Sequence, residues 1–295
     1  MIKVQNLTKH FGDFCALDSL ALHVPKGAVY GLVGPNGAGK TTFIRHLTGV
    51  YRPDAGEVLI DGETVYENPA VKNRFSYIPD EVFYFHSANL NDMMKFYSGI
   101  YGNFDTALYH KLCEAFSLDP KKPIRSFSKG MQKQAAFLLS LSTRPDLLIL
   151  DEPVDGLDPV MRRQVWSLIL QDVAERNATV LVSSHNLREL EDVCDHVGIM
   201  HQGKMLLERS RAELQGNIVK VQVAFSDKRP ANLEILHSSQ NGRLESLIVR
   251  GPQEEIRSKI EAVQPLFFDL VPLSLEEVFV YELGGVSYDV KNIIL

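Results

Sequence analysis

The chain has 295 residues, a length that predicts about two domains at roughly 150 residues each. Hydrophobic residues make up 45% and charged residues 23%, proportions that exclude a disordered or collagen-like chain and are typical of a globular protein. The formal net charge of −6 argues against a broad surface for nucleic acid or anionic lipid, so no nucleic-acid partner is expected.

The first eighty residues predict strands around a single helix. Apolar and polar residues alternate near the N-terminus, which favours a half-buried antiparallel sheet with strands at 2–6, 14–17 and 20–24. A nearly continuous apolar run at 28–33 indicates a buried parallel strand, and a Gly-rich loop leads from it into a helix at 40–47. Further strands are predicted at 56–60 and 74–78.

The middle of the chain predicts helices inserted into this α/β framework. Asn91 is the expected N-cap of the first helix, and further helices are predicted at 105–116 and 128–143. Strands then alternate with helices, which predicts a mainly parallel sheet. These strands are expected at 147–150, 179–183, 197–200 and 204–208, and the helices at 161–175 and 187–194.

After about residue 214 the pattern restarts and predicts a small α+β appendage. Its strands are expected at 219–225, 233–237, 246–249 and 266–271, and its helices at 253–262 and 275–283.

A phosphate-binding loop is predicted where Gly34-Pro-Asn-Gly-Ala-Gly-Lys-Thr41 matches G-x-x-x-x-G-K-[ST] between a strand and a helix. Its glycines let backbone N–H groups converge on phosphate oxygens, and the positive helix end faces the same anion. Lys40 is placed to reach the β- and γ-phosphates, Thr41 to ligate Mg²⁺ and Thr42 to donate to the α-phosphate. The alternative is a Gly-rich turn before a helix. The predicted nucleotide contacts are Gly34, Pro35, Asn36, Gly37, Ala38, Gly39, Lys40, Thr41 and Thr42.

A second motif is the apolar strand at 147–150 that ends in Asp151 and Glu152. Carboxylates at the end of such a strand point into the crevice where open α/β sheets bind ligands. Asp151 would hold Mg²⁺ through water, and Glu152 would polarise a water for in-line attack on a phosphate. Alone this motif is weak, but together with the phosphate loop it predicts nucleotide hydrolysis.

With three further motifs, the chain resembles the ATP-binding cassette (ABC) ATPases, the nucleotide-binding subunits of ABC transporters. Phe127-Ser-Lys-Gly-Met131 is similar to the family signature, Gly156-Leu-Asp158 to the D-loop and Ser183-Ser-His185 to the switch histidine. The resemblance covers residues 1 to about 211. It implies an α/β P-loop NTPase fold with a RecA-like parallel sheet core, an antiparallel β subdomain and a helical subdomain. The expected boundaries are 1–213 for the cassette, about 86–143 for its helical subdomain and 214–295 for an accessory domain.

The resemblance also implies roles for single residues. Two cassettes would enclose two ATP molecules head to tail, and Ser128 and Gly130 would contact the γ-phosphate held by the other subunit. Asp158 would link the two active sites, although it also fits a simple helix N-cap. His185 would hydrogen-bond the γ-phosphate and help to hold the attacking water, the alternative being a satisfied core histidine. Phe11 would stack on adenine, or would be a half-buried strand residue.

The chain departs from the family pattern in places. Lys129 and Met131 replace a signature Gly and Gln, and Asp80 stands where the family usually has Gln. Asp80 would act as a catalytic group on Mg²⁺ or the attacking water, or would only shape its loop. These variants and the tail at 274–279 resemble bacitracin-export and related Gram-positive exporter cassettes. The aromatic segment 82–85 would line a groove for a short helix of the membrane subunit, or would pack in the core.

The function that the resemblance implies is ATP hydrolysis coupled to export, with ATP and Mg²⁺ as cofactors. The expected partners are a second cassette, identical or different, and integral membrane permease subunits at the inner face of the membrane. The N-terminus lacks a signal-peptide core, and no apolar stretch nears the roughly 18 residues that span a bilayer. The three cysteines fit neither a disulfide framework nor a zinc site, which favours the cytoplasm.

Two alternative functions remain open at this point. A non-transport cassette could act on DNA or the ribosome, but such proteins carry a long coiled-coil insertion or usually two cassettes on one chain. A cassette could also bind ATP without hydrolysing it, and the presence of Glu152 and His185 argues against that.

Overall fold

The computed structural model describes residues 1–210, 213, 218–225, 229–230, 232–271, 273–274 and 277. Contacts divide the chain into two units, residues 1–185 with 196–208 and residues 186–195 with 209–295. Each unit has a hydrophobic core of its own. Among the described residues, no helix is both long and apolar enough to cross a membrane.

The first unit begins with two long strands, where three short ones were predicted. β1 (Ile2–Phe11) pairs antiparallel with β2 (Phe14–Val24), and β4 (Ala55–Ile60) and β5 (Glu63–Thr64) complete the sheet in the order β2-β1-β4-β5. The predicted breaks are absent because the β1–β2 ladder shifts register at three places and so continues past irregular residues.

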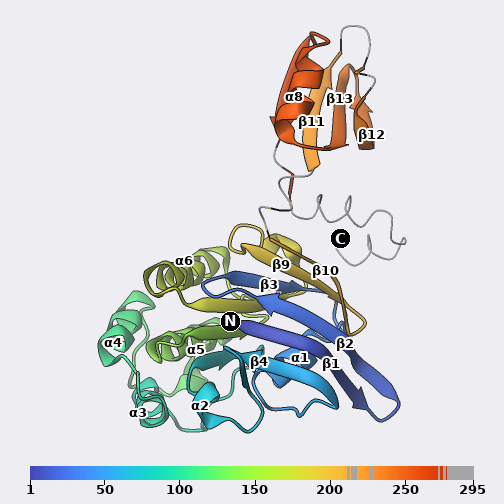
Figure 1. Ribbon diagram of the computed structural model, residues 1–295. Coiled ribbons are helices and arrows are strands. Elements are labelled where there is room, and N and C mark those ends of the chain that lie inside the picture. Colours follow the sequence, from blue (N-terminus) through green and yellow to red (C-terminus); the bar gives the residue numbers. More distant parts are fainter. Residues whose placement is uncertain are drawn as a thin grey trace. The chain divides into compact units, whose positions relative to one another are not determined.

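A six-stranded sheet of order β10-β9-β3-β8-β7-β6 forms the centre of the first unit (Figure 1). Its parallel strands are β3 (Val29–Val33), β6 (Phe75–Ile78), β7 (Leu147–Asp151), β8 (Thr179–Ser184) and β9 (His196–His201), and β10 (Lys204–Ser210) lies at the edge. Every residue of β3, β7 and β8 is buried, which explains their continuous apolar runs. The predicted mainly parallel α/β core is therefore confirmed.

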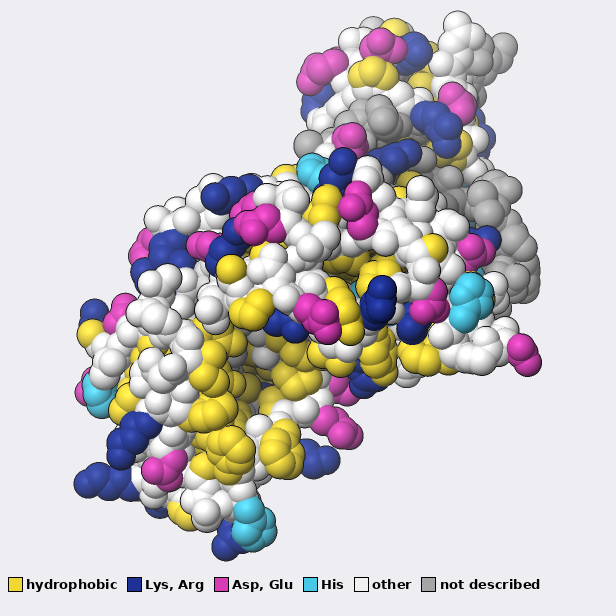
Figure 2. Space-filling model, turned by 60° about the horizontal axis from the view of Figure 1, so that its bottom comes forward, with side chains coloured by type: hydrophobic (Ala, Val, Ile, Leu, Met, Phe, Trp, Pro, Cys, Tyr) yellow, Lys and Arg dark blue, Asp and Glu magenta, His cyan; other side chains and the backbone are white. Residues whose placement is uncertain are grey.

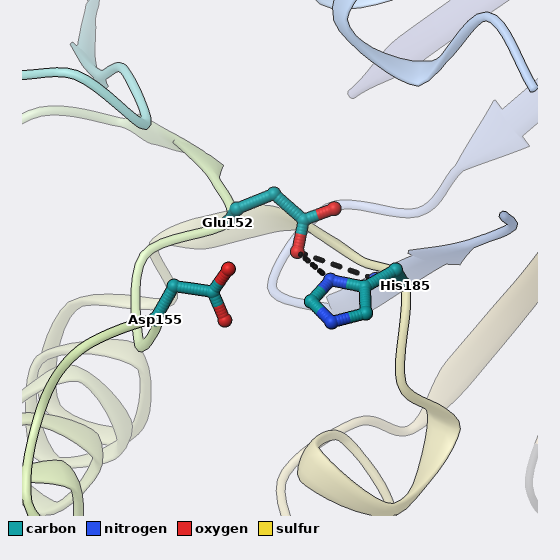
Figure 3. Close-up of side chains that lie close together, drawn as sticks. All are labelled: Glu152, Asp155 and His185. Carbon is teal, nitrogen blue, oxygen red and sulfur yellow. Dashed lines mark hydrogen bonds and ion pairs between the residues drawn. The ribbon is translucent and has the colours of Figure 1, made fainter. Parts of the chain in front are cut away.

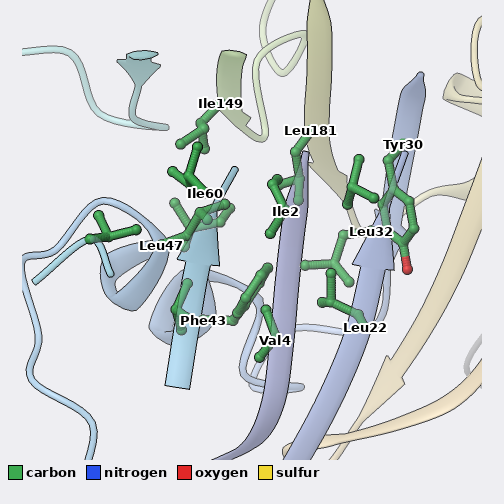
Figure 4. Close-up of a cluster of buried hydrophobic side chains, with 14 of the residues drawn as sticks. Ile2, Val4, Leu22, Tyr30, Leu32, Phe43, Leu47, Ile60, Ile149 and Leu181 are labelled. Carbon is green, nitrogen blue, oxygen red and sulfur yellow. The ribbon is translucent and has the colours of Figure 1, made fainter. Parts of the chain in front are cut away.

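Helix α1 (Lys40–Leu47) joins the two sheets into one core. Its Phe43 and Leu47 are fully buried and lie in one cluster with Ile2 from the antiparallel sheet and Leu32 from the parallel sheet (Figure 4). Because α1 begins where the predicted phosphate loop ends, this packing fixes the loop against both sheets.

The predicted helical segment contains α3 (Leu90–Ile100), α4 (Thr106–Ala115), the 3₁₀ turn η1 (Ile124–Ser126) and α5 (Lys129–Ser142), and a short helix α2 (Pro69–Lys72) precedes it. The expectation that Asn91 caps the first helix is wrong. The N-cap is Asn89, whose side chain accepts from the Asp92 N–H while the Asp92 carboxylate accepts from the Asn89 N–H. This reciprocal capping box satisfies two backbone donors at once, which a cap at Asn91 would not do.

The chain after β7 continues in α6 (Pro159–Arg176) and β8. The helix predicted at 187–194 is wrong, because the structure has only the 3₁₀ turn η2 (Leu187–Glu189) there. The Leu190 and Val193 N–H groups donate to carbonyls three residues earlier and the Cys194 N–H donates to the Leu190 carbonyl, so the segment forms short turns in place of a continuous α-helix.

The second unit contains a four-stranded antiparallel sheet of order β12-β13-β11-β14. It comprises β11 (Ile218–Ala224), β12 (Glu234–Asn241), β13 (Leu244–Arg250) and β14 (Phe267–Val271), with α8 (Gln253–Glu261) against the sheet. Its core includes Val221, Val223, Leu247 and, from α8, Ile256 and Ile260. The helix predicted at 275–283 and the residues just after the predicted boundary at 213 lie outside the described residues, apart from Glu277.

Candidate functional site

The predicted phosphate loop forms the connection between β3 and α1. Gly37 and Gly39 have left-handed φ angles of 82° and 104°, which glycine adopts without a steric penalty. Gly34 is required for a different reason, because a Cβ there would come within 2.3 Å of the Met200 carbonyl oxygen. Backbone conformation and close packing therefore both demand glycine in this loop.

The loop lines an open pocket of about 330 Å³. Of the nine predicted contacts, the eight from Pro35 to Thr42 line this pocket. The other walls come from β2, through Phe14 and Ala16, and from the loops that follow β6 and β7, through Asp80 and Glu152. The carboxyl ends of two neighbouring parallel strands thus meet the phosphate loop, as open α/β sheets arrange a ligand site.

Lys40 is buried at the floor of this pocket. Its Nζ donates to the Gly34 carbonyl oxygen at 2.6 Å and lies 3.2 Å from Glu152 Oε1. The lysine charge is therefore held beside the loop N–H groups and paired with a carboxylate, a position from which it can meet an anion in the pocket.

Asp151, the last residue of β7, is 2% exposed. Burial raises the pKa of Asp151, and hydrogen bonds from the Ser183 and Thr41 hydroxyls oppose that shift. The Ser183 Oγ donates to Asp151 Oδ1 at 2.6 Å. Because Mg²⁺ takes hard oxygen ligands, the adjacent carboxylate of Asp151 and hydroxyl of Thr41 fit that ion.

Glu152 adopts a left-handed backbone with a φ of 47°. Its Oε2 lies 3.0 Å from His185 Nδ1 and also accepts from the His185 backbone N–H at 3.2 Å (Figure 3). Asp155 lies beside this pair, and one carboxylate oxygen of each acidic residue and one His185 ring nitrogen all lie within 4.8 Å of one another. Asp155 is not among the residues predicted from the sequence, although its place between the predicted Asp151 and Asp158 is a signal.

Asp80 is exposed at the edge of the pocket, 3.5 Å from Lys133 Nζ. Lys133 comes from α5 and also donates to the Glu152 carbonyl oxygen at 3.1 Å. Lys133 is not among the residues predicted from the sequence, and its position two residues beyond the signature-like motif is the one signal for it.

Two aromatic residues, Phe11 and Phe14, flank the turn between β1 and β2, and the predicted stacking of Phe11 on adenine stays a prediction. Phe11 packs edge-on against Tyr51, with ring centroids 5.5 Å apart, and Lys9 Nζ lies 5.7 Å from its ring centroid. Phe14, its partner across the β1–β2 ladder, is 65% exposed and lines the pocket. The structure thus adds Phe14 to the candidate residues.

The remaining predicted residues lie at helix starts outside this pocket. Ser128 caps α5, because its Oγ accepts from the Met131 N–H at 3.2 Å, and Gly130 lies in the first turn. Asp158 caps α6, because its Oδ1 accepts from the Val160 and Met161 N–H groups, each at 3.0 Å. The N-cap interpretation of Asp158 is thus seen directly.

A phosphate loop at a helix N-terminus, a buried aspartate at a strand end and a glutamate paired with a histidine define the site of a P-loop nucleotide-hydrolysing protein. The comparisons with known proteins narrow this class. The ABC transporter family matches residues 17–155. The ABC transporter ATP-binding protein YtrB of Bacillus subtilis strain 168 is 31% identical over 290 residues, which covers 97% of this chain and 99% of YtrB.

Two further relatives agree. The bacitracin transport ATP-binding protein BcrA of Bacillus licheniformis is 36% identical over 211 residues, covering 70% of this chain and 69% of BcrA. A solved structure of an ATP-binding subunit of an ABC transporter superposes with a TM-score of 0.68 at 27% identity, covering 73% of this chain and 92% of that one. The chain belongs to the ATP-binding subunits of the ABC transporter family, which bind ATP and couple its hydrolysis to transport. The predicted family, cassette fold and ATPase activity are therefore confirmed.

Proposed function

We propose that this chain is the ATPase subunit of an exporter, in which two cassettes close around two ATP molecules and drive membrane-spanning partner subunits. The observation that carries the proposal is the meeting of Lys40, Asp80 and Glu152 with the phosphate loop in one pocket. Export is supported by the likeness to BcrA, which is named as a bacitracin transport protein.

The contacts of Lys40 and Glu152 suggest how hydrolysis proceeds. ATP lies along the loop N–H groups, and its β- and γ-phosphates compete with Glu152 for the Lys40 ammonium, which lies 3.2 Å from that carboxylate. Glu152 is then free to accept a proton from a water whose oxygen attacks the γ-phosphorus, while the bond to the ADP oxygen breaks. His185, 3.0 Å from Glu152, orients this carboxylate and hydrogen-bonds the γ-phosphate.

Thr41 and Asp151 are the residues that would hold Mg²⁺, because the Thr41 hydroxyl hydrogen-bonds the Asp151 carboxylate and Thr41 lines the pocket. The ion, when bound, neutralises charge on the β- and γ-phosphate oxygens. The Asp80 carboxylate lies 3.5 Å from Lys133 Nζ, and its predicted contact with Mg²⁺ or with the attacking water is untested.

A second cassette would supply the groups that this pocket lacks. Ser128 and Gly130 lie at the N-terminal end of a 14-residue helix, where backbone N–H groups and the helix dipole favour an anion. We place them on the γ-phosphate held by the partner, with Asp158 at the contact between the two sites. Adenine would lie at the β1–β2 end of the pocket, where Phe11 and Phe14 flank the turn.

The membrane partner would dock on an aromatic surface formed by Phe83, Phe85, Phe96 and Ile100, which are 85%, 54%, 45% and 48% exposed. The rings of Phe85 and Phe96 pack edge-on at 5.3 Å. Figure 2, with the side that carries α3 turned forward, shows hydrophobic side chains gathered there. The core-packing interpretation of 82–85 is thus wrong for Phe83 and Phe85. A short amphipathic helix of a permease at the inner membrane face would cover this surface.

Co-purification tests the transport assignment. Detergent extraction followed by mass spectrometry should recover an integral membrane protein with the wild-type chain, and Phe83→Asp should lose it. Leu266→Asp, at an equally apolar position that is 69% exposed in the second unit, is the matched control and should retain the partner. Recovery of ribosomal proteins or DNA in place of a membrane protein would favour a non-transport cassette instead.

A further inference from the structure

Lys133 connects three segments that are far apart in the sequence. It projects from α5, its side chain is 12% exposed, and its Nζ lies 3.5 Å from Asp80 Oδ1 after β6. The same Nζ donates to the carbonyl oxygen of Glu152 after β7, at 3.1 Å. One ammonium group of α5, the helix that begins at the signature-like motif, therefore contacts the loops after β6 and β7, which both line the nucleotide pocket.

The bond to Glu152 bears on the geometry of the proposed base. A φ of 47° is sparsely populated for a residue with a Cβ, and such conformations persist only where surrounding contacts fix them. The Glu152 N–H donates to Ser183 Oγ at 3.0 Å, and its carbonyl accepts from Lys133. The peptide groups on the two sides of this residue are thus held from β8 and from α5.

Asp80 is the carboxylate that forms an ion pair with Lys133. A nearly buried ammonium group is costly unless it is paired and hydrogen-bonded. Glu152 supplies a neutral carbonyl, since its carboxylate is already engaged by Lys40 and His185, so Asp80 supplies the opposite charge.

We propose that Lys133 is a positioning residue for ATP hydrolysis, which holds Glu152 in its conformation as the base. Asp80 acts through Lys133 as its counter-ion and not by touching Mg²⁺ or the attacking water. This inference rests on the proposed role of Glu152.

The first test separates catalysis from binding. Lys133→Met keeps an apolar stem and removes the ammonium group, so kcat should fall about tenfold while KM for ATP changes by less than about twofold. Lys133→Arg, which restores the charge and the donors, should recover most of the rate. Lys111→Met, at an exposed lysine of α4, is the control and should hydrolyse ATP at the wild-type rate.

The second test uses the pair. Asp80→Asn should lower kcat in the wild-type background and change it by less than about twofold in the Lys133→Met background, because both act through one contact. The Mg²⁺ concentration that gives half of the maximal rate should stay unchanged in Asp80→Asn. Circular dichroism and binding of a fluorescent ATP analogue show that each variant is folded, and Lys133→Gln replaces Lys133→Met if the latter is not.

Several outcomes would overturn the inference. For Lys133, they are wild-type hydrolysis by Lys133→Met and Lys133→Gln, an effect of these variants on KM alone, or no recovery of kcat in Lys133→Arg. For Asp80, they are a fall in kcat of the double variant equal to the product of the two single falls, or a raised Mg²⁺ requirement in Asp80→Asn. Undiminished hydrolysis by Glu152→Gln would instead overturn the proposed function of the base itself.

Discussion

The carboxylate of Glu152 contacts both Lys40 Nζ and His185 Nδ1. Glu152→Gln keeps the shape of the side chain but cannot accept a proton, so kcat should fall by at least about 100-fold. ATP binding should persist, because Lys40 is then free for the phosphates. Phosphate release measures the first effect, and an ATP-dependent dimer in size-exclusion chromatography measures the second. Glu114→Gln, at an exposed carboxylate of α4, is the control.

Asp151 is placed for function at a cost in stability. Burial raises the pKa of Asp151 above its ordinary value of 3.8, so the folded protein binds this proton more tightly than the unfolded chain does. The ionised carboxylate therefore lowers the free energy of unfolding above its folded-state pKa, and the penalty vanishes below pH 3.8. Asp151→Asn should raise Tm at neutral pH without nucleotide, yet slow Mg²⁺-dependent hydrolysis by at least about tenfold.

The control for this prediction is Asp269→Asn, an exposed carboxylate of β14, which should leave Tm and hydrolysis unchanged. An Asp151→Asn protein that melts below the wild-type temperature would contradict the pKa argument. It would show that the hydrogen bonds from Ser183 and Thr41 outweigh the burial of the charge.

At the scale of single residues, the sequence predicts what local chemistry determines. The phosphate loop could be predicted because its glycines, Lys40 and Thr41 lie within eight consecutive residues, and each is required by backbone conformation, close packing or the anion. The role of Lys133 could not be predicted from the sequence, because its contacts join three segments that only the folded sheet brings together. That Phe14 lines the pocket could not be predicted either, because the pocket wall depends on how β2 lies beside the phosphate loop, which is distant in the sequence.

The N-terminus of α5 has two uses that can be separated. Ser128→Ala removes the cap and should lower the free energy of unfolding by about 1 kcal/mol. Ser128→Asp keeps the cap and favours the helix dipole, but it places a negative charge where the partner's γ-phosphate is proposed to bind. In the Glu152→Gln background it should melt no lower than the parent yet fail to dimerise with ATP. A Ser128→Asp protein that still dimerises would limit Ser128 to capping.

Elements were predictable where one face or a whole run is buried, and less so at their ends. The continuous apolar runs of β3, β7 and β8 reflect burial on both faces of a sheet. The start of α3 depends on which asparagine pairs with Asp92, and the spacing from Asn89 fits a capping box while that from Asn91 does not. The segment 187–194 is apolar at helical spacing, but its backbone bonds form short turns and no continuous helix.

At the scale of the whole molecule, the two units have separate cores. The first is built from β1, β2, α1 and the parallel sheet, and the second from β11, β13 and α8. A unit with its own core and sheet is able to fold alone. The appendage was predictable as an α+β unit from its restarted pattern, and its boundary at 213 stays a prediction.

The separate cores lead to a prediction for two fragments divided at the proposed boundary, a division that leaves residues 186–195 with the cassette. Residues 1–213 carry every residue that lines the pocket, so this fragment should bind a fluorescent ATP analogue within about twofold of the full chain, since binding energy resides in local contacts. Residues 214–295 should unfold cooperatively on their own, since Val221, Leu247 and Ile256 bury one another without the first unit. Thermal melts of both fragments and of the full chain provide the measurement. A 1–213 fragment that is folded but has lost nucleotide binding would show that the appendage completes the site, and a 214–295 fragment without a melting transition would show that its core needs the cassette.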